Sequence, residues 1–334
     1  LGQNAVQRFG PRLPFLLKVL SAGEPLSIQA HPNKAQAEAL HARSPQHYPD
    51  EHHKPEIAVA LDALDALVGV KPVAALQQAL ELYPELQTFL GHKACRQFRY
   101  EQSAAPQERA RHLFASLLRR SVTHARVLDE CLSRLAQRLR AAPGPLGELE
   151  CLFLELREKY RGPDPGLFAL FLMNLVHLQE GQAIFTQAGE PHAYLKGNIV
   201  ECMANSDNVV RVGLTPKFRD VDAMIEILHV QSSPVQIIQA DAGPGLVSYP
   251  IPSEEFGLSR FRLGPGLRES WLEGGRLIFL LVTQGQATLT WSEATRLVER
   301  DIPTGQAFLL PAILNRFHLR ARDSAEVFLA EVPD

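Results

Sequence analysis

The stretch LSIQAHP, residues 26–32, is the most informative part of this chain of 334 residues. It has the character of a β-strand, in which side chains alternate between the two faces with a period of two. Gln29 and His31 are therefore expected on one face, a few ångströms apart. An amide oxygen and an imidazole directed at one point can begin a metal site, although a lone Gln-x-His pair is more commonly a solvated strand face.

Two later segments offer partners for this pair. Glu56 ends the segment HHKPE, residues 52–56, and His192 lies within GEPHAY, residues 189–194. Two imidazoles, one carboxylate and one amide oxygen form a ligand set that suits zinc and leaves room for water or substrate. Because no thiolate takes part, the set indicates a catalytic site. Either segment could instead be a polar turn, since Gly and Pro mark turns regardless of function.

Several blocks, in this order along the chain, resemble the type I phosphomannose isomerases, which are zinc enzymes built on cupin barrels. The blocks are LPFLLKVL (13–20), LSIQAHPNK (26–34), YPD (48–50), HKPE (53–56), GEPHAYL (189–195), ECMANSDN (201–208) and VRVGLTPK (210–217). The resemblance implies one zinc ion per chain and an active-site arginine, Arg211. The four implied zinc ligands are Gln29, His31, Glu56 and His192.

The resemblance also implies an activity, the interconversion of mannose 6-phosphate and fructose 6-phosphate, which feeds GDP-mannose synthesis. Such an intramolecular oxidoreductase moves a proton between C1 and C2 through an enediol, and zinc acts as a Lewis acid. Arg211 is expected to stabilise the developing charge. The candidates for the proton carrier, among which the sequence does not choose, are Glu201, Lys54 and His53. The candidates for binding the phosphate are Lys217, Lys18 and Ser27.

Two other functions remain open from the residues. An iron-dependent cupin oxygenase would use two histidines and a carboxylate, but this facial triad leaves Gln29 without a role. A non-catalytic sugar-binding cupin would bind the sugar without turnover. The identity of the bound metal and an isomerase assay distinguish the three.

The expected fold is mainly β with an inserted α-helical domain. Residues 1–70 and 181–242 are expected to form a metal-binding cupin (jelly-roll) barrel, residues 71–180 a helical domain, and residues 243–334 a second cupin-like barrel without metal. The family has a further N-terminal region ahead of the first block. The first barrel is therefore expected to lack its N-terminal strands.

Local patterns support this division. Apolar residues follow helical spacing in the middle of the chain, in a first stripe from Leu128 to Leu139 and a second from Phe168 to Leu178. Later, the apolar runs 277–282 and 287–291 flank Gln284-Gly285-Gln286, which predicts a β-hairpin.

An internal repeat links the two expected barrels. The segment GQAIFTQA, residues 181–188, matches GQAFLLPA, residues 305–312, at four of eight positions. The same offset of 124 residues places Arg316 where His192 stands. The repeat predicts two related barrels, of which only the first carries the metal histidine, unless the match is a chance likeness of two strands.

Composition narrows the partners. A net charge of −3 and a pI near 6.5 argue against nucleic acid, which needs a basic face. No apolar run is long enough to span a membrane. Four scattered cysteines predict no disulfide framework and therefore a reducing compartment, the cytoplasm. The expected partner is a small phosphosugar, bound by a monomer.

Overall fold

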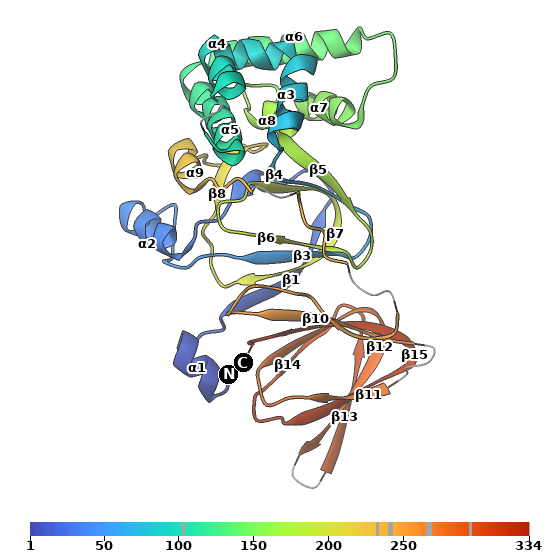
Figure 1. The fold of residues 1–334 in the computed structure, drawn as a ribbon. Coiled ribbons are helices and arrows are strands. Elements are labelled where there is room, and N and C mark those ends of the chain that lie inside the picture. The colour runs from blue at the N-terminus through green and yellow to red at the C-terminus, as the bar shows by residue number, and fades with distance from the viewer. Residues whose placement is uncertain (102–103, 232–233, 240–242, 265–268, 294–295, 334) are drawn as a thin grey trace.

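The protein is mostly β-sheet, with a helical region at one end. The computed structural model describes residues 1–333 except 102–103, 232–233, 240–242, 265–268 and 294–295. Figure 1 shows three regions along the long axis: the helices at the top, an eight-stranded sheet in the middle and a seven-stranded sheet at the bottom. The expected mainly β composition is confirmed.

The eight-stranded sheet is organised by its longest strand, β7 (His192–Ala204). The first part of β7 pairs with β4 (Leu64–Val70) and contacts β2 (Ile28–Ala30), and the second part pairs with β1 (Phe15–Ala22) and β3 (Glu56–Ala60). Three shorter strands complete the sheet: β5 (Met173–Leu178), β6 (Ala183–Thr186) and β8 (Val210–Gly213). The strand β7, which follows the helical region, thus pairs with four strands that precede that region in the sequence.

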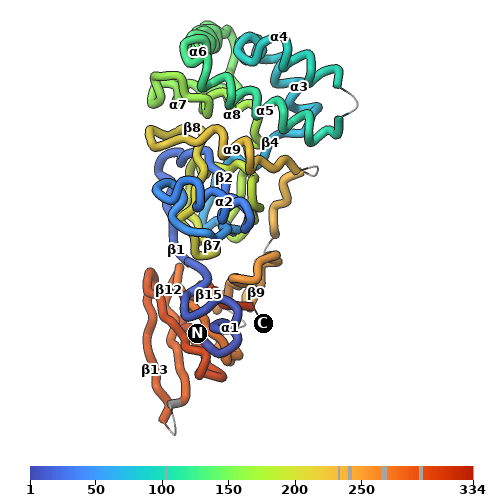
Figure 2. Tube along the Cα trace, turned by 90° about the vertical axis from the view of Figure 1, so that its left-hand side faces the viewer, coloured from blue at the N-terminus to red at the C-terminus, as the bar shows by residue number. Residues whose placement is uncertain are grey.

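Six of the helices follow one another between β4 and β5. They are α3 (Val73–Leu82), α4 (Pro84–Tyr100), α5 (Pro106–Thr123), α6 (Ala125–Arg140), α7 (Glu148–Lys159) and α8 (Gly166–Leu172). The first leucine stripe lies on α6, where Leu128 and Leu139 are buried in a core shared with the sheet. Figures 1 and 2 both place α9 (Val221–Ile227) between α5 and α2 (Lys34–Arg43), beside the sheet.

The helical pattern ends earlier than the sequence predicted. Residues 173–178 were expected to continue a helix, but they form strand β5, which pairs with β4 from Leu64↔Leu178 to Val70↔Met173. The spacing of Leu172, Leu175 and Leu178 fits a helix, and pairing with a distant strand overrides it. The strand β2 is also shorter than expected. It ends at Ala30, one residue before His31.

The seven-stranded sheet comprises the rest of the chain. Its strands are β9 (Gly245–Ser248), β10 (Gly257–Leu263), β11 (Glu269–Glu273), β12 (Ile278–Glu293), β13 (Arg296–Pro303), β14 (Ala307–Leu310) and β15 (Arg316–Glu331). The predicted hairpin at Gln284-Gly285-Gln286 is wrong, because β12 runs straight through it. Gly285 has φ +71° and lies at a break in register with β15, which is a β-bulge.

The internal repeat is confirmed at the level of strands. β14 begins and ends 124 residues after β6, and β15 begins 124 residues after β7. The pairing also matches, because Glu56↔Thr186 in the first sheet corresponds to Ile278↔Leu310 in the second. A shared apolar core that includes Phe15, Val200 and Phe328 joins the two sheets.

Two expectations from composition can be compared with the fold. All four cysteines are free, and three of them are buried. Among the residues that the structure describes, no helix is both long and apolar enough to cross a membrane.

Candidate metal centre and active site

Three neighbouring strands place three of the predicted residues in one row. On β2, Gln29 is paired with His192 of β7 on one side and with Arg211 of β8 on the other. Residues directly opposite each other on neighbouring strands project from the same face, and adjacent strands lie roughly 4.8 Å apart. The row therefore places a guanidinium two strands away from His192, with the amide of Gln29 between them.

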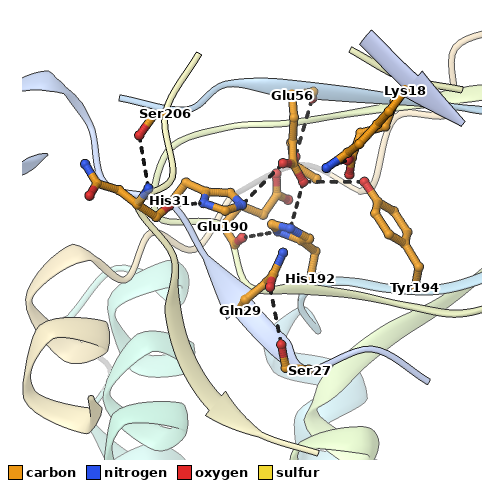
Figure 3. A network of polar contacts seen from close by, with 12 residues as sticks. Lys18, Ser27, Gln29, His31, Glu56, Glu190, His192, Tyr194 and Ser206 are labelled. Atoms are coloured by element: carbon orange, nitrogen blue, oxygen red, sulfur yellow. Dashed lines mark hydrogen bonds and ion pairs between the residues drawn. The ribbon is translucent and has the colours of Figure 1, made fainter. Parts of the chain in front are cut away.

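Glu56 brings the two histidines together. Its carboxylate lies 2.8 Å from His192 Nε2 through Oε1 and 3.3 Å from His31 Nε2 through Oε2. Figure 3 shows both rings directed at this carboxylate. The three side chains are 1–2% exposed, and one ligand atom from each lies within 4.8 Å of the others. The cluster contains three of the four ligands that the sequence predicted.

The hydrogen bonds around the rings decide which nitrogen faces the cluster. His31 Nδ1 donates to the backbone carbonyl of Asn208 at 2.8 Å, and His192 Nδ1 donates to the carbonyl of Glu190 at 3.0 Å. A carbonyl only accepts, so in the neutral ring Nδ1 keeps the proton and Nε2 presents a lone pair to the cluster. Neither Nε2 atom has a hydrogen bond of good geometry.

Lone pairs of two imidazoles and a carboxylate thus meet at one buried point, which needs a proton or a cation. Burial alone would raise the pKa of Glu56, but the two imidazoles lower it well below its ordinary value. Burial lowers the pKa of His31, whereas for His192 the attraction of Glu56 exceeds the effect of burial and raises the pKa. Nitrogen and oxygen donors converging in this way fit a divalent zinc ion.

Gln29 lies beside this cluster with its amide oxygen turned aside. The hydroxyl of Ser27 donates to Gln29 Oε1 at 3.3 Å, and Figure 3 shows the amide nitrogen nearer to His192. Rotating the terminal amide by half a turn exchanges the two atoms and would direct the oxygen at the cluster. Ser27, a predicted phosphate ligand, is therefore already a partner of Gln29.

Charged groups border the cluster on β1 and β7. Lys18 Nζ lies 2.8 Å from Glu201 Oε2, and Glu201 is only 4% exposed. Burial and the nearby charge of Glu56 raise the pKa of Glu201, while Lys18 opposes them. Lys54 lies close enough for its charge to lower the pKa values of both His31 and Glu201. Glu201 is thus a buried carboxyl beside the cluster.

The remaining candidates are less closely gathered. His53 Nε2 contacts Glu255 at 2.7 Å, so its ring is turned toward the segment that precedes β10. Within the described residues Arg211 has no carboxylate partner, and partial burial lowers its pKa. Lys217 is exposed in the segment after β8.

Two contributors were missed by sequence reasoning. Tyr194 is buried and donates to Glu56 Oε1 at 3.4 Å. Its position two residues after His192 on the same strand was a usable signal, because such side chains share a face. Asn208 holds His31 through its backbone, and its side chain donates to the backbone carbonyl of Asp50 at 2.7 Å. A backbone contact across such a sequence separation leaves no trace in the residue types.

Comparison with known proteins gives a consistent result. The profile for phosphomannose isomerase type I, catalytic domain, matches residues 1–73. The mannose-6-phosphate isomerase of Bos taurus is 40% identical over 301 residues, which are 86% of this chain and 70% of the relative. The chain belongs to the type I phosphomannose isomerase family. The Schizosaccharomyces pombe member of the family is 35% identical over 304 residues, covering 86% of this chain and 73% of the relative.

Other members are covered less fully. The human mannose-6-phosphate isomerase is 44% identical over 237 residues, which are 70% of this chain and 56% of the relative. Among solved structures, a mutant of phosphomannose isomerase from Salmonella typhimurium matches with a TM-score of 0.83 at 30% identity, covering 98% of this chain and 81% of that one. A mannose 6-phosphate isomerase bound with zinc and yttrium matches with a TM-score of 0.82 at 29% identity, covering 98% and 82%.

Proposed function

We propose that this chain is a zinc-dependent isomerase that interconverts mannose 6-phosphate and fructose 6-phosphate. The observation that carries the proposal is the convergence of His31 Nε2 and His192 Nε2 on the buried carboxylate of Glu56, at 3.3 and 2.8 Å. Family membership supports the reaction, and a zinc-bound structural neighbour supports the metal.

The zinc ligands in this proposal are His31, Glu56, His192 and, after rotation of its amide, Gln29. When bound, zinc acts as a Lewis acid toward the oxygens on C1 and C2 of the sugar, which stabilises developing negative charge by several kcal/mol. The chain's own residues prepare this site. The carbonyls of Asn208 and Glu190 fix both rings so that Nε2 faces the ligand position.

Proton transfer between C1 and C2 needs a group that changes its protonation state beside the sugar. Glu201 suits this role best among the three candidates, because it is buried beside the cluster and its pKa is raised. Lys54 lies nearby, and its positive charge would stabilise an enediolate. His53 suits the role least, because it is paired with Glu255.

Arg211 and Lys217 complete the site in this proposal. Arg211 projects from the same face as Gln29 and has no carboxylate partner within the described residues, so its guanidinium is available to a developing oxyanion. Lys217 is exposed and forms no ion pair within the described parts of the chain, which suits the phosphate. Lys18 and Ser27 already have partners, Glu201 and Gln29.

The finer architecture is part of the same proposal. We assign residues 1–70 and 181–242 to a catalytic cupin barrel, residues 71–180 to an inserted helical domain and residues 243–334 to a cupin-like barrel without metal. Within residues 71–180 the strand β5 is the exception, because it pairs with β4 of the first barrel. We further propose a cytoplasmic monomer whose product supplies GDP-mannose synthesis.

The test is an assay of fructose 6-phosphate formation from mannose 6-phosphate, before and after treatment with a chelator. Turnover that disappears with the chelator and returns with zinc supports the proposal. Mannose 6-phosphate binding without turnover in the zinc-loaded protein would indicate a sugar-binding cupin. Oxygen consumption restored by ferrous iron, with no isomerase activity restored by zinc, would indicate an oxygenase.

A further inference from the structure

A strained residue marks the segment between Arg211 and Lys217. Leu214 has φ +53°, in the left-handed region that residues with a Cβ seldom adopt. Among the described residues it is the only one other than glycine with positive φ. Such conformations persist only where surrounding contacts hold them, and they concentrate at functional sites. The contacts that hold Leu214 therefore bear on the residues at either end of its segment.

Both backbone groups of Leu214 are held by the helical region. Its N–H donates to Asp164 Oδ1 at 2.9 Å, and its carbonyl accepts from the Tyr160 hydroxyl at 2.8 Å. Asp164 and Tyr160 belong to the segment between α7 and α8. The same Oδ1 of Asp164 also accepts from Gly166 N at 2.7 Å, so one oxygen joins the helical region to the turn after β8.

The two backbones approach so closely that glycine is required on both sides. A Cβ on Gly213 would lie 2.5 Å from Gly166 Cα, and a Cβ on Gly166 would lie 2.7 Å from Leu214 N. Both neighbouring atoms belong to the backbone, so neither can move aside without shifting the chain. The contact between the helical region and β8 is thus fixed to a narrow geometry at the point where the Arg211 strand ends.

A backbone hydrogen bond joins Asp220, a few residues beyond Lys217, to Arg211 itself. Asp220 N donates to the carbonyl of Arg211 at 3.1 Å, and the Tyr48 hydroxyl donates to Asp220 Oδ2 at 2.9 Å. Residues 211–220 therefore form a closed loop, held on one side by Asp164 and on the other by Tyr48. Lys217 lies exposed within this loop.

We infer that Asp164 is a positioning residue for the isomerisation, because its buried carboxylate holds Leu214 in the left-handed conformation and so sets the course of the loop that carries Arg211 and Lys217. The inference rests on the proposed function, since it gives these two side chains their substrate contacts. It also gives the helical region a part in catalysis, although none of its described residues reaches the Glu56 cluster.

The oxygen of Asp164 matters here more than its charge. Asp164 is 6% exposed, and burial raises its pKa despite the backbone donors. Its one cationic neighbour among the described ion pairs, Arg219, lies 3.7 Å from Oδ2 and not from the oxygen that binds Leu214. An asparagine retains an oxygen that can accept both N–H groups, whereas alanine retains none.

The experiment compares Asp164→Ala and Asp164→Asn with the wild type in the full, zinc-loaded chain. Displacing a positioned group by about 1 Å can cost about a hundredfold in rate. We expect Asp164→Ala to lower kcat/KM for mannose 6-phosphate by roughly ten- to a hundredfold, with zinc content unchanged. We expect Asp164→Asn to stay within about threefold of the wild type, because it can keep both hydrogen bonds.

A matched variant separates positioning from loss of stability. Leu289→Ala opens a cavity in the core of the seven-stranded sheet, which contains no residue of the loop, so it should lower the melting temperature and leave kcat/KM unchanged below that temperature. The inference is overturned if Asp164→Ala keeps wild-type kinetics, if Asp164→Asn is as impaired as Asp164→Ala, or if Leu289→Ala gives the same kinetic loss.

Hydrogen exchange supplies a measurement that does not depend on activity. The amides of residues 212–220 should exchange faster in Asp164→Ala and at the wild-type rate in Asp164→Asn. Unchanged exchange in Asp164→Ala would contradict the inference even if the wild type were an active isomerase. If the wild type has no isomerase activity but Asp164→Ala still exchanges faster than the wild type, the loop contact stands and the proposed function is overturned.

Discussion

The two sheets share a framework and differ in what they bury. In the first sheet β3 pairs with β6 and β7, and in the second β12 pairs with β14 and β15. Glu56 pairs with Thr186 of β6, and at the matching position Ile278 pairs with Leu310 of β14. His192, which begins β7, is 1% exposed, whereas Arg316, which begins β15, has a side chain 61% exposed. One framework thus holds a carboxylate and an imidazole inside, and the other has an apolar residue inside and its cation in solvent.

The surroundings of the two positions explain why each is stable. A buried ionisable group is tolerated only when partners satisfy it, and Glu56 has His31, His192 and Tyr194. Ile278 lies in a cluster of apolar side chains that includes Leu280 and Leu329 and offers no such partner. The difference teaches that the repeat supplies the backbone, and that a few side chains decide which copy can bind a metal.

The largest expected effect comes from giving the first sheet the residue of the second. Glu56→Ile should abolish stoichiometric zinc binding and lower turnover by on the order of a thousandfold or more, because the metal contributes several kcal/mol. Zinc content by mass spectrometry and the isomerase rate are the measurements. Retention of one zinc per chain in this variant would show that Glu56 is not a ligand.

The second prediction distinguishes the contribution of Arg211 to catalysis from the binding of the metal. Arg211→Ala should lower kcat by about a hundred- to a thousandfold, the usual cost of one oxyanion-stabilising donor. Zinc content should not change, because a guanidinium is not a zinc ligand. The pair of measurements, rate and metal content, is made on the same preparation. Near-normal turnover would remove Arg211 from the mechanism.

The reverse exchange tests whether the framework alone can bind metal. Ile278→Glu should destabilise the protein by about 3 kcal/mol, because it buries a carboxylate without partners. It should add no second zinc ion. Chemical denaturation gives the stability, and Ile278→Leu is the control, with an expected loss below about 1.5 kcal/mol. A second bound zinc would mean that a single carboxylate at position 278 is enough to give the second sheet a metal site.

The smallest expected effect concerns the ion pair between the two regions, His53 with Glu255. His53 and the Ser253 hydroxyl lower the pKa of Glu255 from 4.5 to about 2 against the effect of burial. A lowered carboxyl pKa stabilises the fold fully above pH 4.5, and this stabilisation is lost as the pH falls toward 2. Glu255→Gln should therefore cost about 1 kcal/mol at pH 7 and about half of that or less at pH 3.

Unfolding free energies of the wild type and Glu255→Gln at the two pH values measure this effect. An equal difference at pH 3 and pH 7 would show that the pair contributes through packing and not through charge.

The sequence predicted the parts of this molecule that depend on local pattern or on motif. The repeat located β6 and β14 and matched the first residues of β7 and β15, and the motif blocks located the cluster of His31, Glu56 and His192. Two predictions failed because local pattern was ambiguous. Residues 173–178 have spacing that fits a helix but pair with β4, and Gly285 resembles a turn residue but forms a bulge within β12.

Other features could not be predicted because they join backbone atoms far apart in the chain. The carbonyl of Asn208 fixes His31, and Asp164 holds the N–H of Leu214. Backbone groups are the same in every residue, so residue types carry no signal for such contacts. The pairing of His53 with Glu255 is likewise long-range, and it makes His53 the least suitable of the three candidates for proton transfer.

The central claim is that one zinc ion binds in the first sheet and none in the second. The most direct measurement is anomalous X-ray scattering at the zinc edge from crystals of the zinc-loaded protein. We expect a single peak per chain, about 2.0–2.2 Å from His31 Nε2, His192 Nε2 and a Glu56 oxygen, with the Gln29 oxygen turned toward it. A peak between β12 and β15, or no peak at Glu56, would contradict the account.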